Sequence, residues 1–175
     1  MKVKNSEELQ KVNGGAENIE NIKDRVGEEF STNVVITRDQ IISFVEVTGD
    51  ANQVHYDESR SRESILASQI EGKIIVPGFL SLSLCANREI IFNTLAKGEP
   101  HEQINLGLSD VKFIAPVYND LDIEYNFVIK SVKDTYIKGK KSAKVEWEIL
   151  VSKVVGEEKV LCMKATWFVA YVSLK

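Results

Sequence analysis

Apolar and polar residues alternate along most of the second half of the chain, which is the pattern of strands with one buried face. The alternation is clearest at Ile123, Tyr125, Phe127 and Ile129, and it recurs from Val145 to Val151. We predict extended segments over 104–114, 121–133, 136–155 and 159–172, with a break at Gly139 and a hairpin turn at Gly156-Glu157. Short connections of this kind join antiparallel strands.

The first half of the chain changes from a strand pattern to a helical one. Residues 30–36 form a candidate first strand, and Thr37 with Gln40 three positions later is a capping-box pattern that starts a helix. Ile41, Phe44 and Val45 form its apolar face, and Gly49 stands where a helix C-cap glycine belongs. We predict a further short helix over 58–66 in a polar stretch.

Pro77 and Gly78 open the most apolar helix of the sequence, because proline is accepted in a first helical turn. The helix is predicted to run to about Ala96 and to end at Lys97-Gly98. Its first turns are apolar nearly all round, interrupted only by two serines at 81 and 83, so we expect them to be buried. About five antiparallel strands that wrap one buried helix make an α+β domain.

Residues 1–28 are predicted to be a helical extension, and residues 29–175 the main domain. The net charge of −4 argues against non-specific binding to nucleic acid or to an anionic membrane. We expect no membrane span and no signal peptide, and buried free thiols at Cys85 and Cys162, which points to the reducing cytoplasm. With two Cys and two His, the sequence shows no metal-ligand cluster, and we expect no cofactor.

The candidate chemistry lies in the segment Gly49-Asp50-Ala51-Asn52-Gln53-Val54-His55. A spacing of five residues separates Asp50 from His55 on a regular helix or strand, so the two side chains meet only in an irregular loop. An acid and an imidazole in one loop can activate a water molecule. Asn52 has two open interpretations, since it either orients Asp50 or a water molecule, or simply tolerates a left-handed turn.

Gly78 also has two interpretations. Its N–H, free of an intrahelical partner, can bind a developing negative charge, or the missing side chain can simply allow close packing. The remaining candidates are expected to be inert: His101 is predicted to be solvated in a loop, and the basic residues 138–141 a solvated hairpin rather than a phosphate site.

Three stretches, TGDANQVHYD, IIVPGFLSLSL and GLSDVKFIAPV, resemble the MaoC-like dehydratases, the (R)-specific enoyl-CoA hydratases and their nodulation-protein-N-like relatives. The resemblance covers residues 29–117 and implies a hot-dog fold, a homodimer, and a CoA or acyl-carrier-protein thioester as substrate. It implies interconversion of trans-2-enoyl and (R)-3-hydroxyacyl thioesters. Asp50 and His55 would then activate water, the Gly78 N–H would bind the thioester oxygen, and Asn52 would belong to the substrate site.

The sequence departs from the family pattern at two positions. Many members have Pro where this chain has Gln53, and His where this chain has Pro77. Two alternatives accompany the hydratase interpretation. A hot-dog thioesterase usually needs a carboxylate near the central helix, and none lies between Pro77 and Arg88. A non-catalytic acyl-thioester-binding or assembly subunit would keep the fold without the chemistry, and the presence of both Asp50 and His55 argues against it.

Overall fold

Five antiparallel strands form one curved sheet in the computed structural model, which describes residues 18–66, 73–86 and 100–175. Their order across the sheet is β1-β3-β4-β5-β2, so β1 and β2 are the two edges. The strands are β1 Glu29–Val35, β2 His101–Phe113, β3 Asp122–Ile137, β4 Lys140–Val155 and β5 Glu158–Ser173. All five predicted strands are present, but some bounds differ: β2 begins three residues earlier than expected, β3 continues past residue 133 to Ile137, and β4 begins at Lys140 and not at residue 136.

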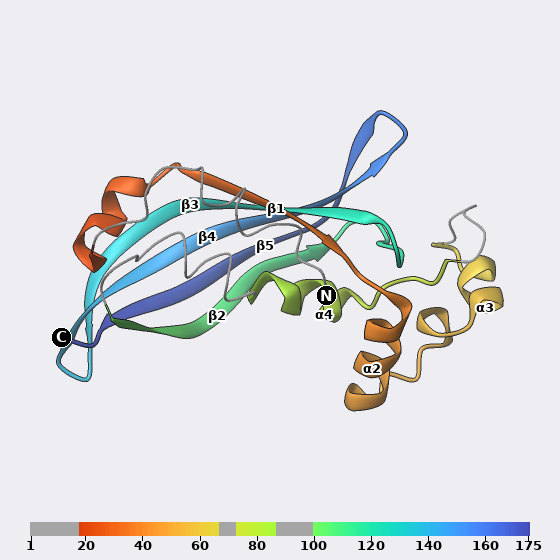
Figure 1. The fold of residues 1–175 in the computed structure, drawn as a ribbon, viewed down its shortest axis with the longest axis horizontal. Helices are drawn as coiled ribbons and strands as arrows, with labels where there is room; N and C mark the ends of the chain where they lie inside the picture. The colour runs from red at the N-terminus through yellow and green to blue at the C-terminus, as the bar shows by residue number, and fades with distance from the viewer. Residues whose placement is uncertain (1–17, 67–72, 87–99) are drawn as a thin grey trace.

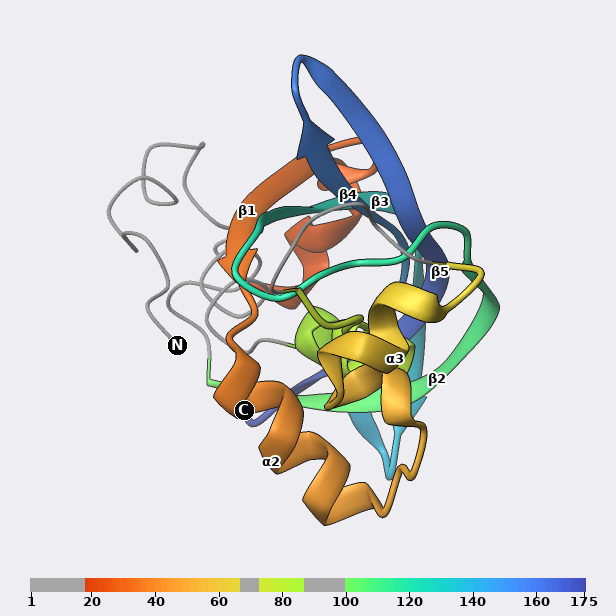
Figure 2. The same ribbon diagram turned by 90° about the vertical axis from the view of Figure 1, so that its right-hand side faces the viewer.

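Short helices lie on the concave side and at one end of the sheet. Figure 1 shows α4 along the concave side near β2, with α2 and α3 beyond one end of the strands, and Figure 2 shows α4 within the curve of the sheet. The helices are η1 Ile19–Arg25, α2 Arg38–Thr48, η2 Gln53–His55, α3 Glu58–Glu63, α4 Gly78–Ser83 and η3 Leu84–Ala86. Within the described ranges, no helix is long and apolar enough to cross a membrane.

The inward face of β3, β4 and β5 forms the core, as the alternating pattern predicts. Tyr125, Phe127 and Trp147 are almost completely buried, and the Trp147 ring meets the rings of Phe30 and Phe127 edge-on, at centroid distances of 5.9 and 6.4 Å. The Tyr125 hydroxyl donates a hydrogen bond of 3.1 Å to the backbone oxygen of Ser81. This bond connects the sheet directly to α4.

The predicted ends of α2 are both confirmed. Thr37 accepts a hydrogen bond from the Gln40 N–H, and the Gln40 side chain accepts one from the Thr37 N–H, which completes the capping box. Gly49 ends the helix in the left-handed conformation at φ 70°. The backbone after α2 is therefore fixed, and Asp50 follows a rigid element.

The prediction for α4 is only partly correct. The described helix covers Gly78–Ser83 and continues as a 3₁₀ turn to Ala86, whereas the predicted end near Ala96 and Lys97-Gly98 falls outside the described residues. Leu80, Ser81 and Cys85 are buried, but Phe79 is 70% exposed, so the prediction of burial all round is wrong. The exposed Phe79 ring nevertheless meets the ring of Phe113 at the end of β2 edge-on, at a centroid distance of 5.8 Å.

Three other predictions have clear outcomes. The helix predicted over 58–66 is shorter, since α3 ends at Glu63. The basic residues 138–141 form the exposed β3–β4 hairpin, as expected, and Lys141 forms an ion pair with Glu20. Cys85 and Cys162 are both free and buried.

The predicted extension over 1–28 is described only from residue 18 onward. There η1 buries Ile19 and Ile22 against the sheet, so this part of the chain packs on the core. Residues 1–17 lie outside the described part, and the domain boundary at residue 28 stays a prediction.

Candidate active site

Asp50 and Asn52 lie in the loop that joins α2 to η2. The backbone N–H of Asn52 donates a hydrogen bond of 3.1 Å to Oδ1 of Asp50. The Asn52 side chain instead accepts from the Val54 N–H, at 3.5 Å, and so caps η2. Because the φ of Asn52 is −71°, the left-handed alternative is wrong. Asn52 orients the Asp50 carboxylate through its backbone rather than through its amide.

His55 is held by the segment that precedes α4. Its Nδ1 lies 2.7 Å from the backbone oxygen of Ile75, and the Ile75 N–H donates to the backbone oxygen of Val54 at 3.2 Å. Because a carbonyl oxygen only accepts, Nδ1 carries the proton. The His55 side chain is 11% exposed, and this hydrogen bond fixes both the orientation and the tautomer of the ring.

The other imidazole nitrogen faces the acid. Nε2 of His55 lies 3.7 Å from Oδ2 of Asp50, which is too long for a direct hydrogen bond. Two acceptor atoms at this separation can both receive hydrogen bonds of about 2.8 Å from one water molecule. In the tautomer that Ile75 imposes, neutral Nε2 offers a lone pair, so the pair can hold a water molecule and take a proton from it.

A cavity of about 300 Å³ adjoins this pair. Asp50, His55, Gly78 and Ser81 all line it. Most of the rest of its wall is apolar, and includes Ile75, Val76, Phe113, Val117, Cys162 and Met163. The arrangement suits a ligand with a reactive polar group and an apolar chain.

Gly78 is the first residue of α4. The space that a side chain at this position would need is filled by another residue. A Cβ atom built there would lie 2.8 Å from the ring of Phe113, and this contact favours the close-packing interpretation. The Ser81 N–H donates to the Pro77 oxygen at 3.1 Å, so the helix starts at Pro77 and the Gly78 N–H belongs to its first turn. First-turn N–H groups have no intrahelical acceptor, so the geometry also allows the oxyanion role.

Cys162 lines the cavity but is poorly suited to act as a nucleophile. Burial raises the pKa of its thiol, and burial raises that of Cys85 to about 12. A thiol with a raised pKa remains protonated near neutral pH, and only the thiolate is strongly nucleophilic. Within the part of the chain described here, no group of three or more His, Cys, Asp or Glu side chains is placed to hold a metal ion.

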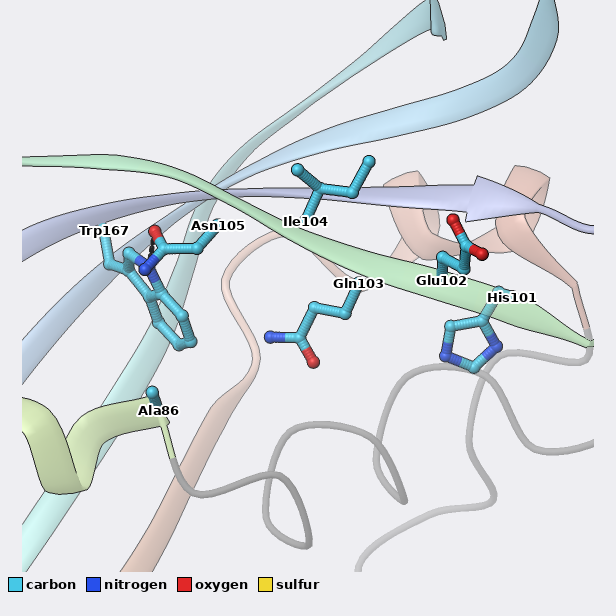
Figure 3. A pocket seen from close by; sticks show the side chains of 7 residues that line it. All are labelled: Ala86, His101, Glu102, Gln103, Ile104, Asn105 and Trp167. Atoms are coloured by element: carbon cyan, nitrogen blue, oxygen red, sulfur yellow. Dashed lines mark hydrogen bonds between the residues drawn. The ribbon is translucent and has the colours of Figure 1, made fainter. Parts of the chain in front are cut away.

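His101 belongs to a separate cavity of about 370 Å³, so the prediction of a solvated loop histidine is wrong. It lies at the start of β2, is half-buried, and its ring centroid is 6.0 Å from that of Tyr171. Figure 3 shows the cavity wall formed largely by β2, with the Asn105 amide accepting a hydrogen bond of 2.8 Å from Trp167 Nε1. The sequence analysis missed this because it placed the strand start three residues too late.

Ser81 is a further cavity residue that the sequence analysis did not single out. The sequence presents it only as an interruption of an apolar run. Its position in the wall depends on how α4 is rotated against the sheet, and a pattern that is apolar nearly all round carries no signal for that rotation.

One family model matches the chain over most of its length. The model of the MaoC like domain matches residues 21–151, which is most of the chain. No curated protein matches the sequence significantly.

Among solved structures, a monoamine oxidase regulatory protein from Archaeoglobus is 21% identical with a TM-score of 0.64, over 86% of this chain and 92% of that one. The (R)-hydratase from A. caviae involved in PHA biosynthesis is 19% identical with a TM-score of 0.59, over 82% and 94%. The HadBC 3R-hydroxyacyl-ACP dehydratase complex from Mycobacterium tuberculosis is 15% identical with a TM-score of 0.60, over 83% and 97%. These similarities establish the hot-dog fold that the resemblance implied.

Proposed function

The chain belongs to the MaoC-like domain family, and we propose on that basis that it interconverts trans-2-enoyl and (R)-3-hydroxyacyl thioesters of coenzyme A or acyl carrier protein. One observation carries the proposal. Asp50 and the Nε2 atom of His55 are 3.7 Å apart at the wall of a largely apolar cavity. A pair of proton acceptors beside an apolar cavity suits the addition of water to an unsaturated acyl chain.

In the hydration direction, Asp50 and His55 hold one water molecule between them. The water oxygen forms a bond to C3 of the enoyl group while Nε2 of His55 accepts its proton. The electron pair of the C2–C3 double bond moves toward the thioester, and negative charge develops on the thioester oxygen. The proton then passes to C2, so that water has added across the double bond and no co-reactant is needed. Dehydration is the reverse sequence.

The Gly78 N–H is the proposed donor to the thioester oxygen. It lines the same cavity as Asp50 and His55, and a first-turn N–H needs an acceptor from outside the helix. Loss of such a donor typically costs about 3 kcal/mol of transition-state stabilisation. Pro77 lacks an N–H of its own, so Gly78 offers the first N–H of the helix.

We also propose that the chain forms a homodimer, or an oligomer built from such dimers, through the edge strand β2. An edge strand leaves a row of N–H and C=O groups available for pairing. The apolar side chains Leu106, Leu108 and Phe113 of β2 are 45%, 44% and 49% exposed. A second copy that pairs along β2 would cover both the backbone groups and these side chains. Light scattering at micromolar concentration tests this, and a stable monomer would contradict it.

The cytoplasm is the proposed location, because free, buried thiols suit a reducing compartment. We assign no cofactor, since the proposed reaction adds and removes only water.

The function is tested by incubating purified protein with crotonyl-CoA and following the loss of the enoyl absorbance. We expect hydration to the (R)-3-hydroxy product, which a chiral separation identifies. Release of free coenzyme A thiol without hydration would indicate the thioesterase instead. If neither reaction occurs on coenzyme A or acyl carrier protein thioesters, the hydratase proposal is wrong and a non-catalytic acyl-binding role takes its place.

A further inference from the structure

Ser81 is a buried residue in the wall of the candidate active site, and its hydroxyl is buried beside the cavity. The residue is 2% exposed and lines the cavity that also contains Asp50 and His55. Its Oγ atom is buried and has no hydrogen-bond partner among the residues that the structure describes. Most buried polar side-chain atoms in proteins have such a partner, so this hydroxyl needs an explanation.

The backbone of Ser81 is fully engaged, which leaves the hydroxyl as its one available polar group. The Ser81 N–H donates to the Pro77 oxygen at 3.1 Å. The Ser81 oxygen accepts from the Tyr125 hydroxyl at 3.1 Å and lies 3.7 Å from Sγ of Cys85. Helix α4 and strand β3 therefore fix the residue in place, while Oγ is not used to hold it.

Ser83 shows what a serine in the same helix ordinarily does. Its Oγ donates a hydrogen bond of 2.8 Å to the Leu80 oxygen, one turn back, and the residue is exposed. Ser81 makes no such bond to an earlier carbonyl. The two serines thus share a helix and differ in burial, in hydrogen bonding and in contact with the cavity.

An unsatisfied buried hydroxyl lowers stability, because folding removes it from water without returning a hydrogen bond. Alanine at this position would avoid that cost. A hydroxyl that the fold does not use, on a residue that lines a reaction cavity, is therefore best explained by a ligand that accepts its hydrogen bond.

We infer that the Ser81 hydroxyl donates a hydrogen bond to the thioester carbonyl oxygen of the substrate, as a second donor beside the Gly78 N–H. Ser81 follows Gly78 by three residues, so both lie on one side of the helix. The acceptors Asp50 and His55 already serve the water molecule at C3. The thioester oxygen is the remaining polar atom near the reacting carbons, and it gains negative charge as water adds, so a donor there lowers the barrier. This inference rests on the proposed function.

The test compares Ser81→Ala with the matched control Ser83→Ala, using kcat and KM for crotonyl-CoA and the melting temperature. We expect Ser81→Ala to lower kcat by about tenfold or more with little change in KM, because the hydrogen bond strengthens in the transition state. Its melting temperature should stay equal or rise. Ser83→Ala should keep kcat, and Ser81→Cys, a weaker donor of similar size, should be intermediate.

The outcomes separate this inference from the proposed function. If the parent protein hydrates crotonyl-CoA and Ser81→Ala keeps its kcat, the role of Ser81 is wrong and the hydratase stands. A rise in KM alone, or a fall in kcat accompanied by a fall in melting temperature, would also overturn the role, because these indicate ground-state binding or structural support. If the parent protein hydrates no enoyl thioester, the hydratase and the role of Ser81 both fall.

Discussion

The two histidines of the chain both lie beside a cavity, yet their surroundings differ. One ring nitrogen of His55 is hydrogen-bonded to the backbone oxygen of Ile75, and the other faces the Asp50 carboxylate. His101 lies on the regular strand β2, beside Tyr171, in a cavity whose wall comes largely from that same strand. Two features of His55 suit proton transfer: a hydrogen bond to the Ile75 oxygen fixes the proton on Nδ1, and Nε2 lies 3.7 Å from Oδ2 of Asp50.

This difference shows why burial beside a cavity is a weak sign of chemistry. The cavity beside His101 is lined by consecutive β2 residues, 101–105, so most of its wall comes from a single element. The site at His55 instead gathers groups from the α2–η2 loop, from η2 and from the start of α4. Several separate elements that bring polar groups to one point are more typical of an active site.

Removal of the His55 imidazole should have the largest effect on activity. General acid–base catalysis is worth about 10²- to 10⁴-fold, so we expect His55→Ala to lose activity in that range or beyond. Because Asp50 and His55 act on one water molecule, the double variant with Asp50→Asn should be little worse than either single variant. Steady-state kinetics on crotonyl-CoA measure this. If the activity loss of the double variant equalled the product of the two single-variant losses, the two residues would not share one water molecule.

The same substitution should also reduce stability. His55→Ala leaves the buried Ile75 oxygen without its hydrogen bond, which typically costs about 1–3 kcal/mol. Urea unfolding measures the loss. Asp50→Asn serves as the control, since the Asp50 side chain is 33% exposed and the substitution keeps its shape.

Gly78→Ala should have the next largest effect, and it tests the close-packing interpretation of this glycine. The added Cβ atom lies 2.8 Å from the Phe113 ring, so the ring or the start of α4 must move. A displacement of about 1 Å at a reacting centre can cost about 10²-fold in rate. The Gly78→Ala/Phe113→Ala double variant removes the clash and keeps the N–H, so it should recover most of the rate of Phe113→Ala alone.

Steady-state kinetics on the three variants distinguish these cases. If Gly78→Ala alone kept the parent rate, the contact with Phe113 would have no bearing on the site. If the double variant stayed as slow as Gly78→Ala, relief of the clash would not restore the reacting geometry.

Tyr125→Phe should have a moderate effect, mainly on stability. Its hydroxyl connects β3 to α4 through the Ser81 oxygen, and burial raises the pKa of Tyr125, so the hydroxyl stays neutral and donates. Loss of one buried hydrogen bond costs about 1 kcal/mol or slightly more. Chemical denaturation measures it, and Tyr136→Phe, which changes a residue 72% exposed, is the matched control. Equal stability of the two variants would contradict this connection.

His101→Ala should have the smallest effect on turnover. The residue lines the second cavity, not the one that contains Asp50, so kcat/KM for crotonyl-CoA should stay within about twofold of the parent value. A tenfold loss of kcat/KM in His101→Ala would contradict the conclusion that His55, and not His101, belongs to the active site.

Local sequence signals predicted the strands, the Thr37 capping box and the Gly49 C-cap, because each depends on a few adjacent residues. They also predicted that Asp50 and His55 meet in an irregular loop. They did not predict the exposure of Phe79, the cavity at His101 or the buried Ser81 hydroxyl. Those depend on how elements rotate and pack against each other, and a uniformly apolar segment carries no information about its rotation.

The central claim is that Asp50 and His55 activate one water molecule for an enoyl thioester, and the Asp50→Asn variant tests it most directly. Asparagine keeps the shape of the side chain and removes its charge. We predict an unchanged melting temperature and a loss of about 10²-fold or more in kcat/KM for crotonyl-CoA hydration. Near-parental turnover of Asp50→Asn, on a substrate that the parent protein hydrates, would contradict the assignment of the site.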